Sequence, residues 1–353
     1  MTRAPELIGD TWFGTSNPRL GIADFSGRFL LLDFWTLCCV NCHHVLAELR
    51  PVEKKYEDVL TVVGVHSPKF EYEKLPDSVA SAIARHGIEH PVLNDPNMST
   101  WQSYGVRAWP TLVLVDPKGE IIAKYSGEGH AHAIDALLEK LVPEYEAAGV
   151  LVRGQGAYAP ASASSSELIQ PGKLVAVPAD YQQLLGGAQL LVSNSGAHTL
   201  VGLELSNLEK PIVKIGSGER GTPDGDFDSA SFSEPYGAVF VEGELAKELD
   251  AHLLVADTAN HLIRSINLET KQVKTIAGTG NQWMQRDATD GDALSINIST
   301  PWDIELVGNQ LLIAMAGEHR IWSLDLLAKK LSIYAGTTNE GLVDGALADA
   351  WFA

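Results

Sequence analysis

Two different spacings of apolar residues divide the first 148 residues into strands and helices. Residues 29–35 and 60–66 are almost continuously apolar, which is typical of buried strands. Between them, Val45, Leu46 and Leu49 recur at helical spacing, which predicts a helix over residues 40–56. The same reasoning predicts strands at 20–23, 92–95, 111–115 and 121–125, and helices at 77–86, 97–104 and 130–146. This alternation indicates an α/β domain over residues 1–148.

Beyond residue 172 the pattern changes to short strand-like runs separated by turn residues. One stretch occurs three times, at residues 190–200, 253–263 and 311–321. Each copy has an apolar run, a polar turn with a histidine, and an alternating strand, and glycine and Asp-Gly signals follow it. Units of four short strands every roughly 40–60 residues predict an all-β propeller over residues 173–353. The sequence holds about three blades of such a propeller.

The repeated histidines, His198, His261 and His319, occupy one place in the three copies. We expect them to hydrogen-bond between strands rather than to bind a metal, because equivalent residues of different blades are spread around a ring. The Asp-Gly pairs are interpreted as turns rather than calcium loops. Residues 149–172, which separate the two parts, are rich in glycine, serine and proline and predict a flexible linker.

All three cysteines fall within residues 38–42, where a predicted strand meets a predicted helix. Cys39 and Cys42 have C-x-x-C spacing. The first cysteine of such a pair lies near unpaired backbone N–H groups and the positive end of the helix dipole, which favours the thiolate. The second lies one turn further on, within reach for closing a disulfide. We therefore predict a reversible disulfide between Cys39 and Cys42.

The run Asp33-Phe34-Trp35 before this C-x-x-C pair resembles the thioredoxin-fold family. In that family an aspartate six residues before the nucleophilic cysteine is a buried proton acceptor, and Asp33 has this separation from Cys39. A proline in cis facing the cysteines is the second landmark, and Pro110 opens an apolar strand after Trp109. The resemblance implies that Cys39 is the nucleophile and Cys42 the resolving cysteine. It also implies that Asp33 takes the proton of Cys42, and that Pro110 and Trp109 form the substrate groove.

Two departures from the usual thioredoxin pattern are visible. Cys38 stands where many members have tryptophan, and Val-Asn replaces Gly-Pro between the cysteines. Cys38 and His43 are therefore candidates for tuning the Cys39 thiolate. In the second part, Asn260-His261-Leu262 spells the signature of the NHL repeat. A thioredoxin-like domain, a linker and NHL blades resemble the family that combines these modules. Because the sequence stops within a repeat, we expect a longer natural protein.

Other interpretations of the cysteine cluster stay open at this point. Residues 39–43 also match the haem-attachment pattern C-x-x-C-H, and the cysteines with His43 or His44 have the composition of a zinc site. We expect no metal and no cofactor, because the thioredoxin context explains the same residues. The function expected is thiol–disulfide exchange on a protein disulfide or thiol, with a protein partner on the propeller. The alternatives are a non-catalytic scaffold with a thioredoxin-like fold, and a peroxidase.

Charge and composition narrow the classes of partner. The formal net charge of −19 argues against nucleic acid and anionic membranes, which require a basic surface. The sequence has no continuous run of 18 apolar residues, so no membrane helix is expected. An odd number of cysteines gathered in one motif favours a reducing compartment over a disulfide framework, which predicts a cytoplasmic protein.

Overall fold

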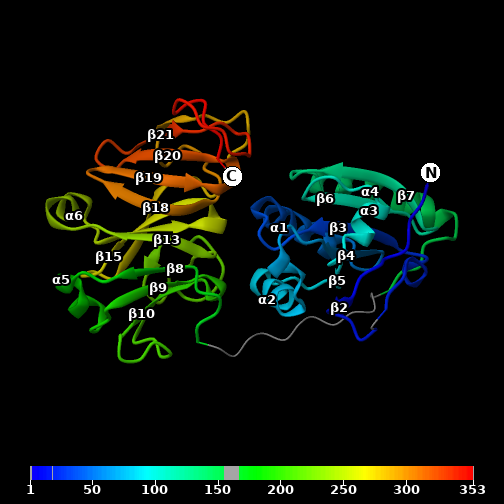
Figure 1. Ribbon diagram of the computed structural model, residues 1–353, viewed down its shortest axis with the longest axis horizontal. Helices are drawn as coiled ribbons and strands as arrows, with labels where there is room; N and C mark the ends of the chain where they lie inside the picture. Colours follow the sequence, from blue (N-terminus) through cyan, green and yellow to red (C-terminus); the bar gives the residue numbers. More distant parts are fainter. Residues whose placement is uncertain (1, 18, 155–166, 353) are drawn as a thin grey trace. The chain divides into compact units, whose positions relative to one another are not determined.

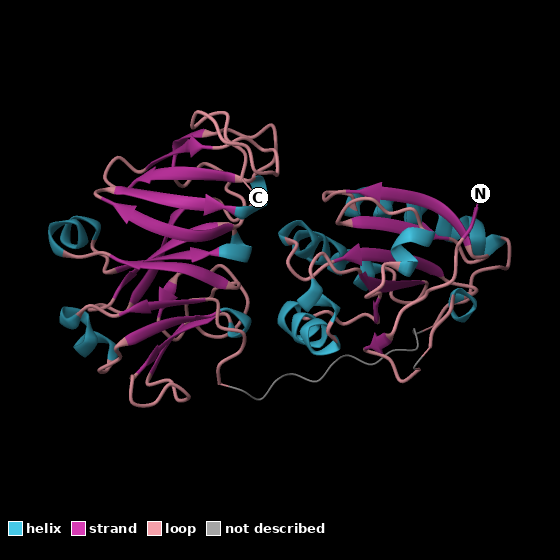
Figure 2. Cartoon of the chain, in the orientation of Figure 1, coloured by secondary structure: helices cyan, strands magenta, loops and turns pink. Residues whose placement is uncertain are grey.

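The computed structural model describes residues 2–17, 19–154 and 167–352 (Figure 1). The chain divides into two compact units, residues 1–164 and 165–353. Strands and helices alternate along the first unit, whereas the second is built almost wholly of strands (Figure 2). Half of the predicted linker, residues 155–166, lies outside the described residues. On either side of that gap, Val152 N–H donates to Gly27 O (2.7 Å) in the first unit, and Ile169 N–H donates to Asn194 Oδ1 (2.7 Å) in the second.

The first unit is a seven-stranded sheet with helices on its faces. Its strands are β1 (Thr2–Arg3), β2 (Thr11–Phe13), β3 (Phe29–Trp35), β4 (Leu60–His66), β5 (Val92–Asn94), β6 (Thr111–Val115) and β7 (Glu120–Ser126). Its helices are α1 (Val40–Lys55), α2 (Pro76–His86), α3 (Ser99–Ser103) and α4 (Ala131–Ala147), with 3-10 turns η1 (Ile22–Phe25) and η2 (Glu71–Lys74). The strand order β1-β7-β6-β3-β4-β5-β2 places β3 at the centre, parallel to β4 and antiparallel to β6.

The two faces of β3 pack against different layers. Leu30, Leu32 and Phe34 join a core with residues of α3 and the N-terminal segment. Leu31 packs instead with α1 and α4, and Trp35 with α1 and α2. Side chains alternate along a strand, so Asp33 shares the face of Leu31 and Trp35. The only acidic residue of β3 is therefore directed toward α1, the helix that begins at the cysteine pair.

The predicted strands and helices of the first unit are confirmed, with one exception. Residues 20–23 were expected to form a strand, and this is wrong, because a 3-10 turn lies at Ile22–Phe25. Local side-chain chemistry favours the turn, since the Gly21 N–H donates to Asp24 Oδ2 (2.7 Å). The short edge strands β1 and β2 escape prediction because two or three residues carry no clear period.

The second unit consists of three antiparallel sheets of four, five and five strands. The first holds β8 (Lys173–Ala176), β9 (Leu190–Asn194), β10 (Thr199–Leu203) and β11 (Val213–Ile215). The second holds β12 (Gly225–Asp226), β13 (Pro235–Phe240), β14 (Leu253–Asp257), β15 (Leu262–Asn267) and β16 (Gln272–Ala277). The third holds β17 (Asp290–Asp292), β18 (Pro301–Val307), β19 (Gln310–Met315), β20 (Arg320–Asp325) and β21 (Lys330–Ala335). Short helices α5 (Ala179–Gln182) and α6 (Gly243–Leu249) and 3-10 turns η3 (Gln183–Leu185), η4 (Ser195–Ala197), η5 (Thr258–Asn260) and η6 (Ala316–Glu318) connect the strands. The β-rich second part is confirmed, and closure into a propeller stays a prediction.

Two of the three repeated histidines link successive sheets. His198, His261 and His319 all have left-handed backbone angles, with φ near 55°. His198 Nδ1 accepts a hydrogen bond from the N–H of Glu234 (3.2 Å), and His261 Nδ1 accepts one from Thr300 (3.0 Å). These two donors immediately precede β13 and β18, which are edge strands of the second and third sheets. His198 and His261 therefore make structural hydrogen bonds, as expected, but from one sheet to the next.

Two of the three Asp-Gly pairs correct the sequence interpretation. They were expected to be turns. Gly225 instead belongs to β12, and Asp290 and Gly291 belong to β17. These short strands pair with β16 and β21 at the outer edges of the second and third sheets. In each of these two sheets, the first strand in sequence therefore forms one edge, and the second strand in sequence forms the opposite edge.

Candidate active site

A disulfide joins Cys39 and Cys42, as the spacing predicts, with their Cα atoms 5.3 Å apart. Cys39 is the N-cap of α1, and its sulfur accepts a hydrogen bond from the Cys42 N–H (3.2 Å). The N-terminus of a helix presents unpaired N–H groups and positive partial charge, so it stabilises a thiolate at this sulfur. The strand-to-helix junction thus supplies the electrostatics that a reactive cysteine requires.

The two sulfurs of the pair differ in access. Cys42 is fully buried in a cluster with Trp35 and Leu46, whereas Cys39 is half-buried at the edge of that cluster. A partner can therefore reach Cys39 more readily than Cys42. This difference agrees with the predicted order, in which Cys39 attacks first and Cys42 resolves, although the roles themselves stay predictions.

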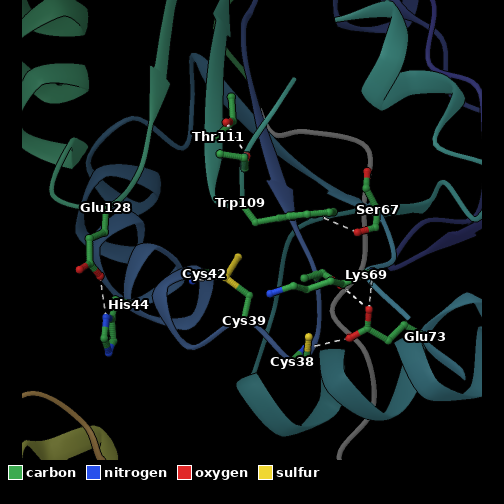
Figure 3. The surroundings of a disulfide bond; sticks show 12 residues. Cys38, Cys39, Cys42, His44, Ser67, Lys69, Glu73, Trp109, Thr111 and Glu128 are labelled. Carbon is green, nitrogen blue, oxygen red and sulfur yellow. Dashed lines mark hydrogen bonds and ion pairs between the residues drawn. A yellow bond between two sulfur atoms is a disulfide. The ribbon is translucent and has the colours of Figure 1, made fainter. Parts of the chain in front are cut away.

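Cys38, the third cysteine, is free and exposed, and it lies beside Glu73 (Figure 3). The Cys38 N–H donates to Glu73 Oε1 (3.1 Å). Desolvation by the surrounding protein, followed by the hydrogen bond and the negative charge of Glu73, raises the pKa of the Cys38 thiol to about 12. Cys38 is therefore protonated at neutral pH, and the two adjacent cysteines have opposite electrostatic surroundings.

Glu73 itself is fully buried and surrounded by donors. Besides Cys38, the Thr36 hydroxyl (2.7 Å) and the backbone N–H groups of Lys69 (2.6 Å) and Phe70 (3.0 Å) donate to its Oε2. Burial opposes ionisation, but these hydrogen bonds keep the pKa of Glu73 below its usual value. The carboxylate thereby ties η2 to the loop that precedes the cysteines.

Asp33 is fully buried, as the resemblance to thioredoxins implies. Neither of its oxygens has a hydrogen-bond partner among the described residues. Burial raises the pKa of Asp33 to about 7, with the charge of His90 opposing the rise and that of Glu53 adding to it. A carboxyl group with this pKa can take up and release a proton at neutral pH, which suits the predicted role as proton acceptor.

Trp109 and Pro110, the residues predicted to form the substrate groove, immediately precede β6. Their peptide bond is cis, as predicted. The Trp109 indole donates to Ser67 O (2.9 Å) and packs, like Cys39, against the cluster around Trp35 (Figure 3). Trp109 therefore flanks the cysteine pair, while its function as part of a groove stays a prediction.

The two histidines after the cysteines have partners on other elements. The ring of His43 stacks on that of His86 from α2, with centroids 3.8 Å apart. His44 Nδ1 lies 2.6 Å from Glu128 Oε2. Tuning of Cys39 by His43 stays a prediction. Within the described ranges no group of three or more His, Cys, Asp or Glu side chains is arranged to hold a metal ion. The same part of the chain contains no helix that is both long and apolar enough to span a membrane.

Sequence reasoning missed Glu73, His90 and Glu53. His90 is buried, and its Nδ1 lies 2.6 Å from Glu53 Oε1. Both residues affect the pKa of Asp33 although they lie far from it in sequence. Only Glu73 had a local signal, because an acidic residue three positions after the start of a turn commonly bonds back to the first N–H.

Comparison with known proteins places this site in a family context. Residues 27–121 match the family described as thioredoxin-like. The thioredoxin-like protein SkfH of Bacillus subtilis is 32% identical over 107 residues, 29% of this chain and 72% of that protein. The thiol-disulfide oxidoreductase ResA of Halalkalibacterium halodurans is 21% identical, over 35% of this chain and 68% of that protein.

Several relatives match both units. The protein Suppressor of quenching 1, chloroplastic, of Arabidopsis thaliana is 36% identical over 98% of this chain and 32% of its own length. NHL repeat-containing protein 2 of Gallus gallus is 35% identical over 93% of this chain and 44% of its own length. The chain thus spans less than half the length of these two relatives. The chain belongs to the thioredoxin-like family, and it resembles NHL repeat-containing protein 2 through both of its units.

Proposed function

We propose that this protein is a thiol–disulfide oxidoreductase in which Cys39 and Cys42 form the redox couple. The observation that carries the proposal is the Cys39–Cys42 disulfide at the start of α1, with one sulfur half-buried and the other fully buried. The family match and the distant relationship to a named thiol-disulfide oxidoreductase support the same chemistry.

In the reducing direction the reaction begins with the Cys39 thiolate. It attacks one sulfur of a partner's disulfide, forms a mixed disulfide and releases the partner's other sulfur as a thiolate. Cys42 then loses its proton to Asp33 and attacks Cys39, which releases the second partner thiol and closes the Cys39–Cys42 disulfide. An external dithiol reopens that disulfide for the next cycle. The oxidising direction uses the same steps in reverse.

The proposed substrate is a protein disulfide or thiol, which approaches Cys39 beside Trp109 and Pro110. The second unit serves in this proposal to bind a protein partner, consistent with its resemblance to NHL repeat proteins.

Reduction of insulin disulfides by the full chain, coupled to dithiothreitol, tests the proposal. We expect turnover in the natural protein, its loss in Cys39→Ser, and mixed disulfides that accumulate in Cys42→Ser. Absence of turnover in the correctly folded natural protein would favour the non-catalytic scaffold. Turnover that survives in Cys39→Ser would assign the nucleophile to Cys38.

A further inference from the structure

In a chain with three neighbouring cysteines, more than one disulfide pairing is possible. A Cys38 thiolate would attack Cys42 in the Cys39–Cys42 disulfide, form a Cys38–Cys42 disulfide and release Cys39 as a thiolate. This exchange is balanced within the chain and needs no added oxidant. Burial of Cys42 restricts attack by an outside partner, whereas Cys38 is next to Cys39 in the chain and is itself free and exposed. Another feature must keep the couple in one pairing.

We propose that Glu73 is a positioning residue that confines disulfide exchange to Cys39 and Cys42, because it holds the neighbouring Cys38 as an unreactive thiol. This inference rests on the proposed function and adds a selectivity device to it. It concerns a residue outside the C-x-x-C motif, on a different element of the fold.

The geometry around Glu73 fixes both its place and its charge. Four donors from two segments converge on the buried carboxylate: the Thr36 hydroxyl and the N–H groups of Cys38, Lys69 and Phe70. Hydrogen bonds to a carboxylate favour its ionised form. Both carboxylate oxygens accept hydrogen bonds from the protein. The side chain is therefore fixed, and its negative charge stays beside Cys38.

The two adjacent cysteines have opposite electrostatic surroundings. At Cys38, desolvation and then the hydrogen bond and negative charge of Glu73 disfavour the thiolate, and the pKa rises to about 12. At Cys39, the sulfur accepts the Cys42 N–H at the start of α1, which favours the thiolate. Since the thiolate is the nucleophile, the protein directs exchange to Cys39 and Cys42.

Alkylation of the reduced full chain tests this inference. Iodoacetamide labelling is followed from pH 6 to 11, and mass spectrometry locates the label on each cysteine. In the natural protein we expect Cys39 to react at neutral pH and Cys38 only above about pH 10. In Glu73→Gln, labelling of Cys38 at pH 8 should rise at least about tenfold, since each pKa unit changes the thiolate fraction about tenfold. Reoxidised Glu73→Gln should contain disulfides that involve Cys38.

Glu71→Gln is the matched control. Glu71 lies on the same turn, but its side chain is 89% exposed and pairs with Lys74. We expect this variant to label like the natural protein. General loosening of the fold would also raise labelling of the buried Cys42, whereas the inference requires that Cys42 stays protected. If Glu73→Gln does not fold, ordinary reactivity of Cys38 in the natural protein would still overturn the inference.

Two results overturn the inference. One is a Cys38 in the natural protein that labels with a midpoint near the ordinary thiol pKa of about 8.5. The other is a folded Glu73→Gln in which Cys38 reacts no faster than before. Neither measurement uses a substrate. Failure of the insulin assay with Cys38 still silent would therefore reject the proposed function, while turnover with a reactive Cys38 would reject only the role of Glu73.

Discussion

Asp33 and Glu73 are both fully buried carboxylates in the same unit, yet their pKa values are shifted in opposite directions. Asp33, on β3, has no hydrogen-bond partner among the described residues, and burial raises its pKa to about 7. Glu73, on η2, accepts hydrogen bonds from four donors, and its pKa is held below the usual value. Burial alone therefore does not decide the charge of a carboxyl group. In this pair the donors directed at the carboxylate make the difference.

The difference matches two chemical tasks. A group that must accept and release a proton needs a pKa near the working pH, which an unpartnered buried carboxyl group provides. A group that must stay charged needs donors that compensate for its burial, which Glu73 has. Asp257 in the second unit is a third case, because it is buried against the guanidinium of Arg264. The same kind of side chain thus occurs with no partner, with neutral donors and with a cation.

The largest effect is expected from Asp257→Ala. Asp257 Oδ2 lies 2.8 Å from Arg264 Nη1, and both side chains are fully buried. Removing the carboxylate leaves a buried charge without its main counterion, which costs about 3–5 kcal/mol of unfolding free energy. Urea denaturation measures the change. Asp224→Ala removes the exposed partner of the same arginine and should cost less. Equal losses in the two variants would contradict the role assigned to burial.

Asp33→Asn should raise the unfolding free energy of the protein, whereas Asp257→Ala should lower it. The pKa of Asp33 is about 7 in the folded protein against an ordinary value of 3.8. The folded state thus binds the proton more tightly, and ionised Asp33 costs stability as the pH rises from about 4 to about 7. The difference amounts to about 4 kcal/mol, reached above pH 7. Asparagine cannot ionise and avoids this cost.

Urea denaturation of the oxidised protein at pH 5 and pH 8 checks this prediction. The gain from Asp33→Asn should be about two to three times larger at pH 8 than at pH 5. The same variant should slow insulin reduction, because Cys42 loses its proton acceptor. A gain independent of pH would show that Asp33 does not titrate as described.

Sequence reasoning found one of the two compared carboxylates and missed the other. Asp33 could be identified from the sequence because it interrupts an apolar strand six residues before Cys39, and both features are local. Glu73 could not be identified in this way, because its significance depends on Thr36 and Cys38, which the fold brings to it from another segment. The helices and longer strands were predictable from their periods. The short edge strands β12 and β17 form only by pairing with strands that come much later in the chain. Because this pairing is not visible in the sequence, they were interpreted as turns.

Glu73→Gln should destabilise the protein, in contrast to Asp33→Asn. The amide group has one acceptor oxygen in place of two, and its NH₂ group faces backbone N–H donors. One or more buried donors lose their acceptor, which costs about 1–3 kcal/mol. Glu71→Gln, at the exposed end of the same turn, should change the unfolding free energy little. If both glutamate variants unfold alike, the four hydrogen bonds of Glu73 contribute nothing measurable.

The smallest effect is expected from Thr36→Val, which removes one donor from Glu73 and leaves the carboxylate in place. The Thr36 hydroxyl donates to Glu73 Oε2 over 2.7 Å, and both residues are fully buried. Loss of this bond should cost about 1 kcal/mol, because three backbone donors still hold the carboxylate. In the Glu73→Gln background the same substitution should cost less, since the charged acceptor is already gone. A double-mutant cycle in urea isolates this coupling. Additive costs would mean that Thr36 stabilises the fold without acting through Glu73, and the donor-based explanation of the low pKa of Glu73 would then rest on the backbone N–H groups alone.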